Sequence, residues 1–165
     1  MNSRLNNRIR VAILSALLWL VVCITAAAPV LALDYNQVSL VGSDFSGRDS
    51  TDSSFTKANL RSGNLSHTNL RGVSFFAANL ESANLEGANL TNATLDAARF
   101  IKTDLTNAVL EGAFAANAKF DGAIIDGADF TDVLLRRDEQ GKLCKVAKGT
   151  NPTTGRNTRD TLFCR

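Results

Sequence analysis

The sequence predicts a solenoid, a fold in which short repeated units stack along one axis. A large apolar residue recurs at every fifth position from Leu40 to Leu135 with only two interruptions, and a small residue, most often alanine, stands two positions before it. An α-helix or a continuous β-strand would distribute side chains with this spacing over several faces. Only a chain that bends in the same way in every pentad keeps them on one inner side, and such repetition is typical of solenoids.

The predicted core is the series of pentad centres. Eleven centres are leucine, six are phenylalanine and one is Ile125, whereas Ser50 and Ala115 interrupt the series. Burial of one such Leu or Phe contributes roughly 1.5–3 kcal/mol, and each repeat buries its centre only against neighbouring repeats. The expected core residues are Leu60, Leu65, Leu70, Phe75, Leu80, Leu85, Leu90, Leu95, Phe100, Leu105, Leu110, Phe120, Ile125 and Phe130.

Six asparagines occupy the position between the small and the large residue, from Asn59 to Asn89. We interpret them as structural, because asparagine tolerates turn dihedrals and hydrogen-bonds to nearby backbone at a recurring corner. A ladder of ligand-binding asparagines is the less favoured alternative.

Two sets of residues depart from the repeat. The segment 48–52 puts Arg48 and Ser50 where small and large apolar residues belong, so we expect a loop or bulge there. Outside the coil, apolar residues replace polar ones directly before four late centres. We expect Phe114 to turn inward in place of Ala115 and the tail to cover the others, and an exposed patch for another protein is the alternative. The four residues are Val109, Phe114, Ile124 and Leu134.

Residues 1–32 are predicted to be an export signal. Three arginines precede an apolar run over residues 11–28 that ends in small residues, and cleavage is expected after Ala32. A retained membrane anchor is the alternative, because the apolar run is nearly long enough to span a bilayer. The arginines are not adjacent, so a Sec-type route is expected.

The remaining chain has an acidic body and a basic tail. Residues 34–135 contain 7 basic and 13 acidic side chains, a net charge of −6, whereas residues 136–165 contain 8 basic and 3 acidic ones, a net charge of +5.

In the tail the five-residue period is lost, and a helix is expected over residues 132–147, with Thr158 capping a last short turn. In an exported protein, Cys144 and Cys164 are expected to form a disulfide, structural or regulatory.

Tandem A-[ND]-L-x-x resembles the pentapeptide-repeat family, which implies an all-β solenoid. Its fold would be a right-handed quadrilateral β-helix of about five coils, with four pentads in each coil. From Leu143 to Cys164 the tail, L-C-x-x-A-x-G-T-N-P-x-T-G-R-x-T-R-x-[ST]-L-x-C, resembles the C-terminal signature of the thylakoid-lumen members of cyanobacteria and chloroplasts. That resemblance implies a C-terminal α-helical cap closed by the disulfide, a location in the thylakoid lumen or periplasm and, with this short signal, a cyanobacterial source.

The expected organisation is a signal peptide (1–32), an N-terminal lead-in (33–37), the repeat β-helix (38–135) and a disulfide-bonded cap (136–165). We expect that the protein is not an enzyme and that it binds neither a cofactor nor a metal ion. The one histidine, His67, has an outer position, and the sequence contains neither a metal-ligand cluster nor a phosphate-binding loop.

The predicted function is that of a protein-interaction scaffold with an unidentified protein partner. No nucleic acid is expected to bind, and membrane contact is expected only through an uncleaved signal segment. Two alternatives stay open. The resemblance to the pentapeptide-repeat family, some members of which imitate DNA, implies a DNA mimic that binds a topoisomerase, and the acidic body is compatible with it. The other alternative is a redox-responsive protein that uses Cys144 and Cys164.

Overall fold

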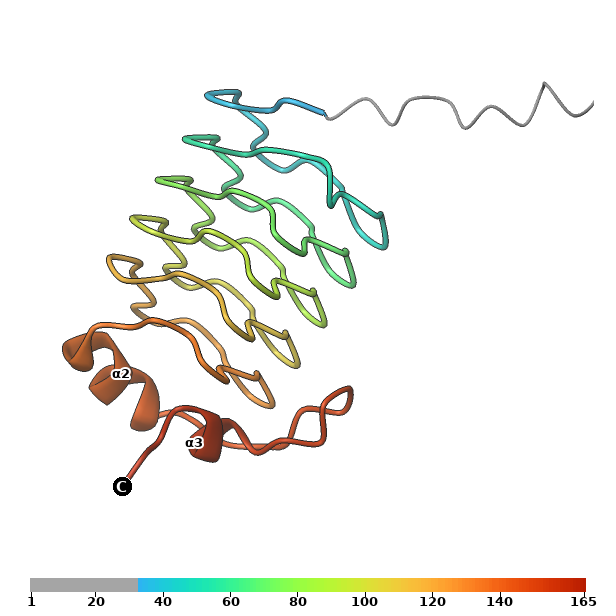
Figure 1. Cartoon of the computed structure of the whole chain (residues 1–165). Helices are drawn as coiled ribbons and strands as arrows, with labels where there is room; N and C mark the ends of the chain where they lie inside the picture. The colour runs from blue at the N-terminus through green and yellow to red at the C-terminus, as the bar shows by residue number, and fades with distance from the viewer. Residues whose placement is uncertain (1–32) are drawn as a thin grey trace, which may run out of the picture. The chain divides into compact units, whose positions relative to one another are not determined.

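The structure, a computed structural model, describes residues 33–165. Ala32–Arg165 forms a compact unit of its own. Within it a stack of coils is followed by two helices, α2 (Arg137–Cys144) and α3 (Thr158–Thr161), at the C-terminal end (Figure 1). The predicted signal peptide and its cleavage site at Ala32 lie outside the described residues.

One turn of the coil takes twenty residues. Asp34 pairs with Ser54 in a parallel bridge, Ser54 pairs with Ser74, and the same offset continues on all four walls to the pair Phe114–Leu134. Between residues 33 and 165 these pairings are isolated bridges rather than runs, so the coil contains no continuous strand of the kind that the predicted β-helix suggests. The right hand of the coil stays a prediction from the family.

Recurring turns explain why the strands are so short. At a typical corner the Ala88 N–H donates to the Leu85 carbonyl over 3.0 Å, and Gly87 has a φ of +63°. The same left-handed conformation recurs at most pentads, also where the residue is not glycine, as at Ala77. Because the chain turns after every three extended residues, two successive bridges never form on one wall.

The asparagines support these corners. The Asn84 Oδ1 accepts a hydrogen bond from the Glu86 N–H at 2.9 Å, and Asn89 does the same for Thr91 at 3.1 Å. Such bonds satisfy a backbone donor at the bend. They are the structural contacts that the sequence predicted for this position.

The core lies inside the coil, where the pentad centres stack in columns. All fourteen predicted core residues are buried, at most 3% exposed. The column that contains Phe75 continues toward the N-terminus as stacked aromatic rings. The ring centroids of Tyr35 and Phe55 are 5.0 Å apart, and those of Phe55 and Phe75 are 5.1 Å apart. Backbone bonds such as Leu85 N–H to Asp104 O, 2.7 Å long, join the coils between these columns.

The N-terminal coil differs from two expectations. The predicted lead-in, residues 33–37, already belongs to the coil, because Asp34 is paired and the Tyr35 ring packs against the core. The bulge expected at residues 48–52 is wrong: Asp49 pairs with Asn69 in register. The Arg48 side chain is exposed, with its guanidinium 5.3 Å from the centre of the Phe45 ring, so the first coil accommodates it without a change of register.

Leu85→Asp is predicted to abolish the folded protein. A carboxylate would replace a fully buried side chain and leave a cavity, costing more than about 5 kcal/mol, which is comparable to the whole stability of a domain. Circular dichroism and soluble yield would measure the loss. The matched control is Asn84→Asp, which places the same side chain one residue away on the outer wall, where Asp104 already occupies the next coil. Normal folding of Leu85→Asp would contradict the stacked register.

Candidate functional site

Phe114 and Leu134 lie side by side on one outer wall. Phe114 is bridged to Thr94 on one side and to Leu134 on the other, so the register passes through Phe114 unbroken. Phe114 is 44% exposed and Leu134 54%, whereas Ala115 is buried. The expectation that Phe114 turns inward is therefore wrong, because the regular bridge pairing keeps Ala115 at the inner position.

The rest of this column is polar. Asp34, Ser54, Ser74 and Thr94 precede Phe114 along the same line of bridges. Only the two positions nearest the C-terminal end carry large apolar side chains, and we call them the Phe114–Leu134 patch. The pair is not part of the inner columns, and adjoining exposed apolar side chains can mark a contact surface.

The other two residues of the predicted set lie elsewhere. Val109 is buried, at 9% exposure, on a wall that the tail covers. Ile124 is 49% exposed, but it stands half a coil from Phe114 and pairs with Asp104, which places it on the opposite wall. The four residues therefore do not form one patch, and the tail covers Val109 alone among them.

Asn151 fixes the tail to the wall of Val109. Its side chain is fully buried, and the Nδ2 group donates to the carbonyls of Asn107, Ala108 and Gly127 at 3.1, 3.2 and 2.9 Å. Its Oδ1 accepts from two backbone N–H groups of the following turn. The sequence indicated only a turn at this segment, because the partners of Asn151 lie 24 to 44 residues away.

An ion pair holds the same segment of the tail. The Arg156 guanidinium lies 3.2 Å from the Asp129 carboxylate and 2.9 Å from Glu111. Burial alone would raise the pKa of Asp129, but hydrogen bonds from the Thr131 hydroxyl and from Thr154, together with the charge of Arg156, outweigh it and lower that pKa. Asp129 is therefore held ionised in the folded protein.

The cap satisfies backbone donors that a further coil would otherwise engage. The buried Glu139 carboxylate accepts from the Phe120 N–H at 3.4 Å, and the Thr161 hydroxyl accepts from the Phe130 N–H at 3.1 Å. The Glu139 charge is balanced by Lys142, 2.9 Å away, and by Lys119, 3.5 Å away. The pKa of Lys142 is raised, chiefly by its hydrogen bond to Glu139.

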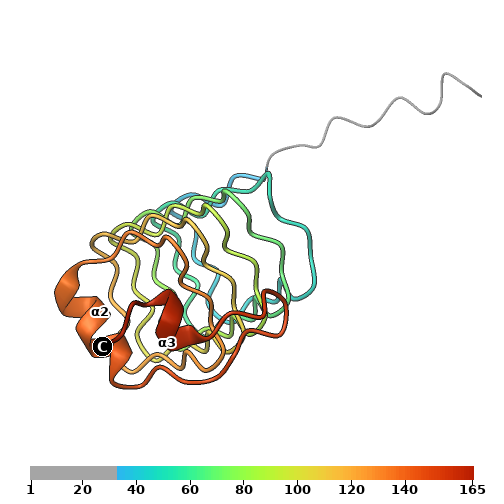
Figure 2. The same ribbon diagram turned by 60° about the horizontal axis from the view of Figure 1, so that its bottom comes forward.

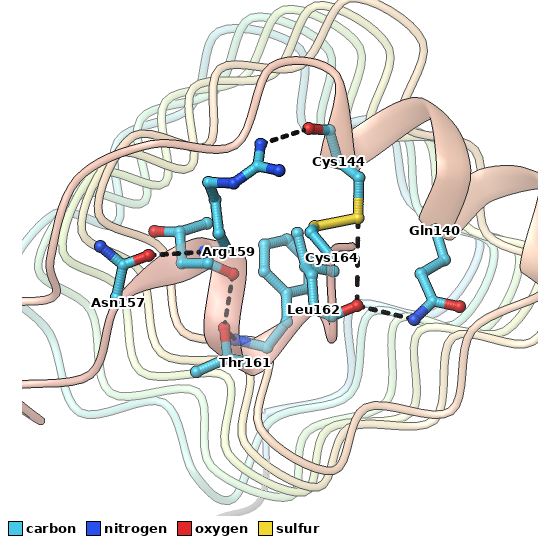
Figure 3. The surroundings of a disulfide bond; sticks show 9 residues. Gln140, Cys144, Asn157, Arg159, Thr161, Leu162 and Cys164 are labelled. Atoms are coloured by element: carbon cyan, nitrogen blue, oxygen red, sulfur yellow. Dashed lines mark hydrogen bonds between the residues drawn. A yellow bond between two sulfur atoms is a disulfide. The ribbon is translucent and has the colours of Figure 1, made fainter.

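The predicted disulfide is present and joins the two helical parts of the cap. Cys144 and Cys164 have Cα atoms 5.5 Å apart, and the Gln140 side chain donates to the Leu162 carbonyl at 2.7 Å beside them (Figure 3). Leu143 and Leu162 pack against the end of the core. The first helix is shorter than the predicted range 132–147, because residues 132–135 still belong to the coil.

The second helix begins one residue earlier than expected. Asn157, not Thr158, is its N-cap, and the Asn157 side chain accepts from the Arg159 N–H at 3.0 Å. Gly149 allows the chain to pass close to the last coil here: a Cβ at this position would lie 2.9 Å from the Gly127 nitrogen.

The described residues contain neither a cluster of metal-binding side chains nor a membrane-spanning helix. His67 is exposed, and among residues 33–165 no group of three or more His, Cys, Asp or Glu side chains is placed to hold a metal ion. In the same part of the chain, neither helix has the length and apolar character needed to cross a membrane.

The model of the pentapeptide repeats matches residues 39–75, 74–112 and 98–137, with eight copies. The chain belongs to the pentapeptide-repeat family. A crystal structure of a pentapeptide-repeat protein from the Arabidopsis thaliana thylakoid lumen is 48% identical, with a TM-score of 0.75 over 77% of this chain and 88% of that chain.

Two further relatives are similar over shorter or more divergent stretches. Thylakoid lumenal 15 kDa protein 1 of Arabidopsis thaliana is 67% identical over 36 residues, which span 22% of this chain and only 16% of that relative. HetL, a pentapeptide-repeat protein involved in heterocyst differentiation regulation in Nostoc, is 24% identical over 62% of this chain and 45% of its own, with a TM-score of 0.36.

Asp129→Asn is predicted to weaken the attachment of the tail by about 1–3 kcal/mol at neutral pH, because Arg156 loses a buried charged partner. The pKa of Asp129 is lowered in the folded protein. Its charge therefore stabilises the fold at pH values above the pKa of the unfolded chain, about 3.9, and this contribution is lost as the pH falls through the folded pKa. Urea unfolding as a function of pH would measure it. The variant should lose stability less steeply than the wild type below about pH 4.

The matched control for this prediction is Asp132→Asn, which removes an exposed carboxylate three residues away. It should leave the stability near the wild-type value. Equal acid sensitivity of the wild type and Asp129→Asn would contradict the role given to Asp129.

Proposed function

We propose that the protein is a non-enzymatic scaffold, exported through a Sec-type signal to the thylakoid lumen or the periplasm, where its outer walls bind another protein. The family and the lumenal relatives support the location. The arginines and the apolar run before residue 33 support export. The fold that carries the walls is a right-handed quadrilateral β-helix of about five coils, closed by the helical cap.

The Phe114–Leu134 patch is the observation that carries this proposal. Both side chains point away from the core, both are about half exposed, and they stand next to each other in a column that is otherwise polar. Apolar side chains gathered on a surface commonly mark a protein contact. Phe114 is bridged on both sides and Leu134 on one, so the wall offers a preformed surface whose ordering costs little on binding.

A redox-responsive role is the second candidate. It is favoured by the position of the disulfide, which links the two helical parts of the cap while both cysteines keep some exposure to solvent. Loss of the bond would release a loop of about twenty residues and lower the free energy of unfolding by roughly 3 kcal/mol in the chain-entropy model. The topoisomerase-binding alternative rests on the resemblance to the family and on the acidic body, and it stays a hypothesis.

The double variant Phe114→Asp with Leu134→Asp is predicted to lose the protein partner. Two charges would replace the centre of the proposed contact, which should weaken binding by at least about tenfold. Affinity capture from a lumenal or periplasmic fraction would measure this, with thermal unfolding of each variant as a check. Because both side chains are outside the core, the variant should remain folded.

Thr94→Asp is the matched control, since it places a charge in the same column one coil earlier. It should keep the partner. Equal capture by the wild type and the double variant would mean that the patch is no contact surface, and loss of folding in the double variant would mean that Phe114 and Leu134 are part of the core.

A further inference from the structure

The tip of the cap, around the disulfide, gathers exposed apolar and cationic side chains that the scaffold function does not use. Lys145 and Val146 directly follow Cys144, and Phe163 and Arg165 flank Cys164, so the bond brings the two short segments together. Val146 is 53% exposed and Phe163 is 75% exposed. Figure 2 shows α2, α3 and the end of the chain together at the C-terminal end of the coil stack.

Phe163 occupies a backbone position that favours glycine. The Cys164 N–H donates to the Arg159 carbonyl and the Phe163 N–H donates to the Asp160 carbonyl, both at 3.0 Å, which is the Schellman pattern at the end of α3. Phe163 is the residue of this pattern with a left-handed backbone, at a φ of +51°. Glycine adopts that conformation without strain, whereas a bulky aromatic residue is disfavoured. A phenylalanine that costs stability here and buries little of its ring indicates a role outside the fold.

Positive charge surrounds these apolar side chains. Lys145 and Arg165 are exposed, and Arg159 is held close by a 2.9 Å hydrogen bond from its guanidinium to the Cys144 carbonyl. Most acidic groups of the cap are neutralised, because Asp138 pairs with Arg136 and the buried Glu139 pairs with Lys142. Asp160 is the acidic side chain of the cap that has no ion pair within residues 33–165.

We propose that this tip, formed by Lys145, Val146, Arg159, Phe163 and Arg165, docks the protein onto the surface of an anionic lipid bilayer. Exposed apolar side chains such as Phe are buried at the boundary between headgroups and acyl chains when a protein lies on a bilayer. Lys and Arg close to an anionic surface each strengthen this binding by roughly fivefold. The binding is reversible, because it depends on one ring, one valine and a few cations rather than on an inserted helix.

A bilayer fits this tip better than an acidic protein does. The centre of a protein–protein contact is depleted of charged residues, and stable contacts bury more than about 1,000 Å² of well-packed surface. Here the apolar groups are two separate side chains that lie among cations. A fluid headgroup layer can surround such a projecting tip without a complementary pocket. Docked in this way, the protein keeps its outer walls, including the Phe114–Leu134 patch, available to a partner.

The test is binding of residues 32–165, which form a compact unit of their own, to sedimented vesicles. Vesicles of equal parts phosphatidylglycerol and phosphatidylcholine should bind the protein, whereas vesicles of phosphatidylcholine alone should bind it much more weakly, and salt should weaken the binding. Phe163→Gly should reduce binding by roughly tenfold while raising thermal stability, because glycine relieves the left-handed position. Lys145→Glu with Arg165→Glu should reduce binding by at least about tenfold.

Two control variants separate the tip from the rest of the molecule. Lys57→Glu with Arg61→Glu makes the same change of charge on exposed residues of the coil and should leave vesicle binding close to the wild-type level. Phe114→Asp with Leu134→Asp should also bind vesicles normally, so this proposal and the scaffold function can fail independently. Absence of binding to anionic vesicles, or equal binding by Phe163→Gly, would overturn the proposal. So would capture of an acidic protein through the same tip residues without vesicle binding.

Discussion

The structure depends on the stacking of inner side chains at intervals of twenty residues. A centre such as Leu85 lies between the centres of the coils before and after it and is fully buried among the other inner side chains. This constraint fixes the register of every wall, because a shift of one residue would turn the inner columns outward. The last coil differs from the others, because no further coil follows it. A cap must therefore cover its inner side chains and backbone groups.

The cap solves this problem at the C-terminal end with a few side chains. Glu139 and Thr161 accept from backbone N–H groups of the last coil, while Leu143 and Leu162 cover its apolar interior. Side chains at the outer positions are not needed for the stacking of coils. Replacing a polar residue there by Phe114 leaves the stacking intact, so the outer walls and the surface of the cap are free to acquire binding functions. Both proposed contacts, the wall patch and the cap tip, lie at this end of the molecule.

The sequence predicted the features that repeat and missed those that depend on contacts between distant residues. The period of five predicted the inner columns, because that signal is local and is repeated in every pentad. The disulfide was predicted from the single pair of cysteines that follows the export signal and from the resemblance of the tail. The outward direction of Phe114 was missed, because Ala115 seemed too small for an inner position and the cost of breaking the bridges was not visible. The roles of Asn151 and Glu139 were also missed, since their partners are backbone groups of other coils.

The register at Phe114 is the point on which the wall patch depends, and cysteine labelling measures it directly. Phe114→Cys and Ala115→Cys, each made in residues 32–165, would be treated with a water-soluble maleimide under native conditions. The stacked register predicts fast modification of Cys at position 114 and strong protection at position 115, where the side chain is 1% exposed. Protection at position 114 with fast modification at position 115 would contradict it, because the chain would then turn Phe114 into the core.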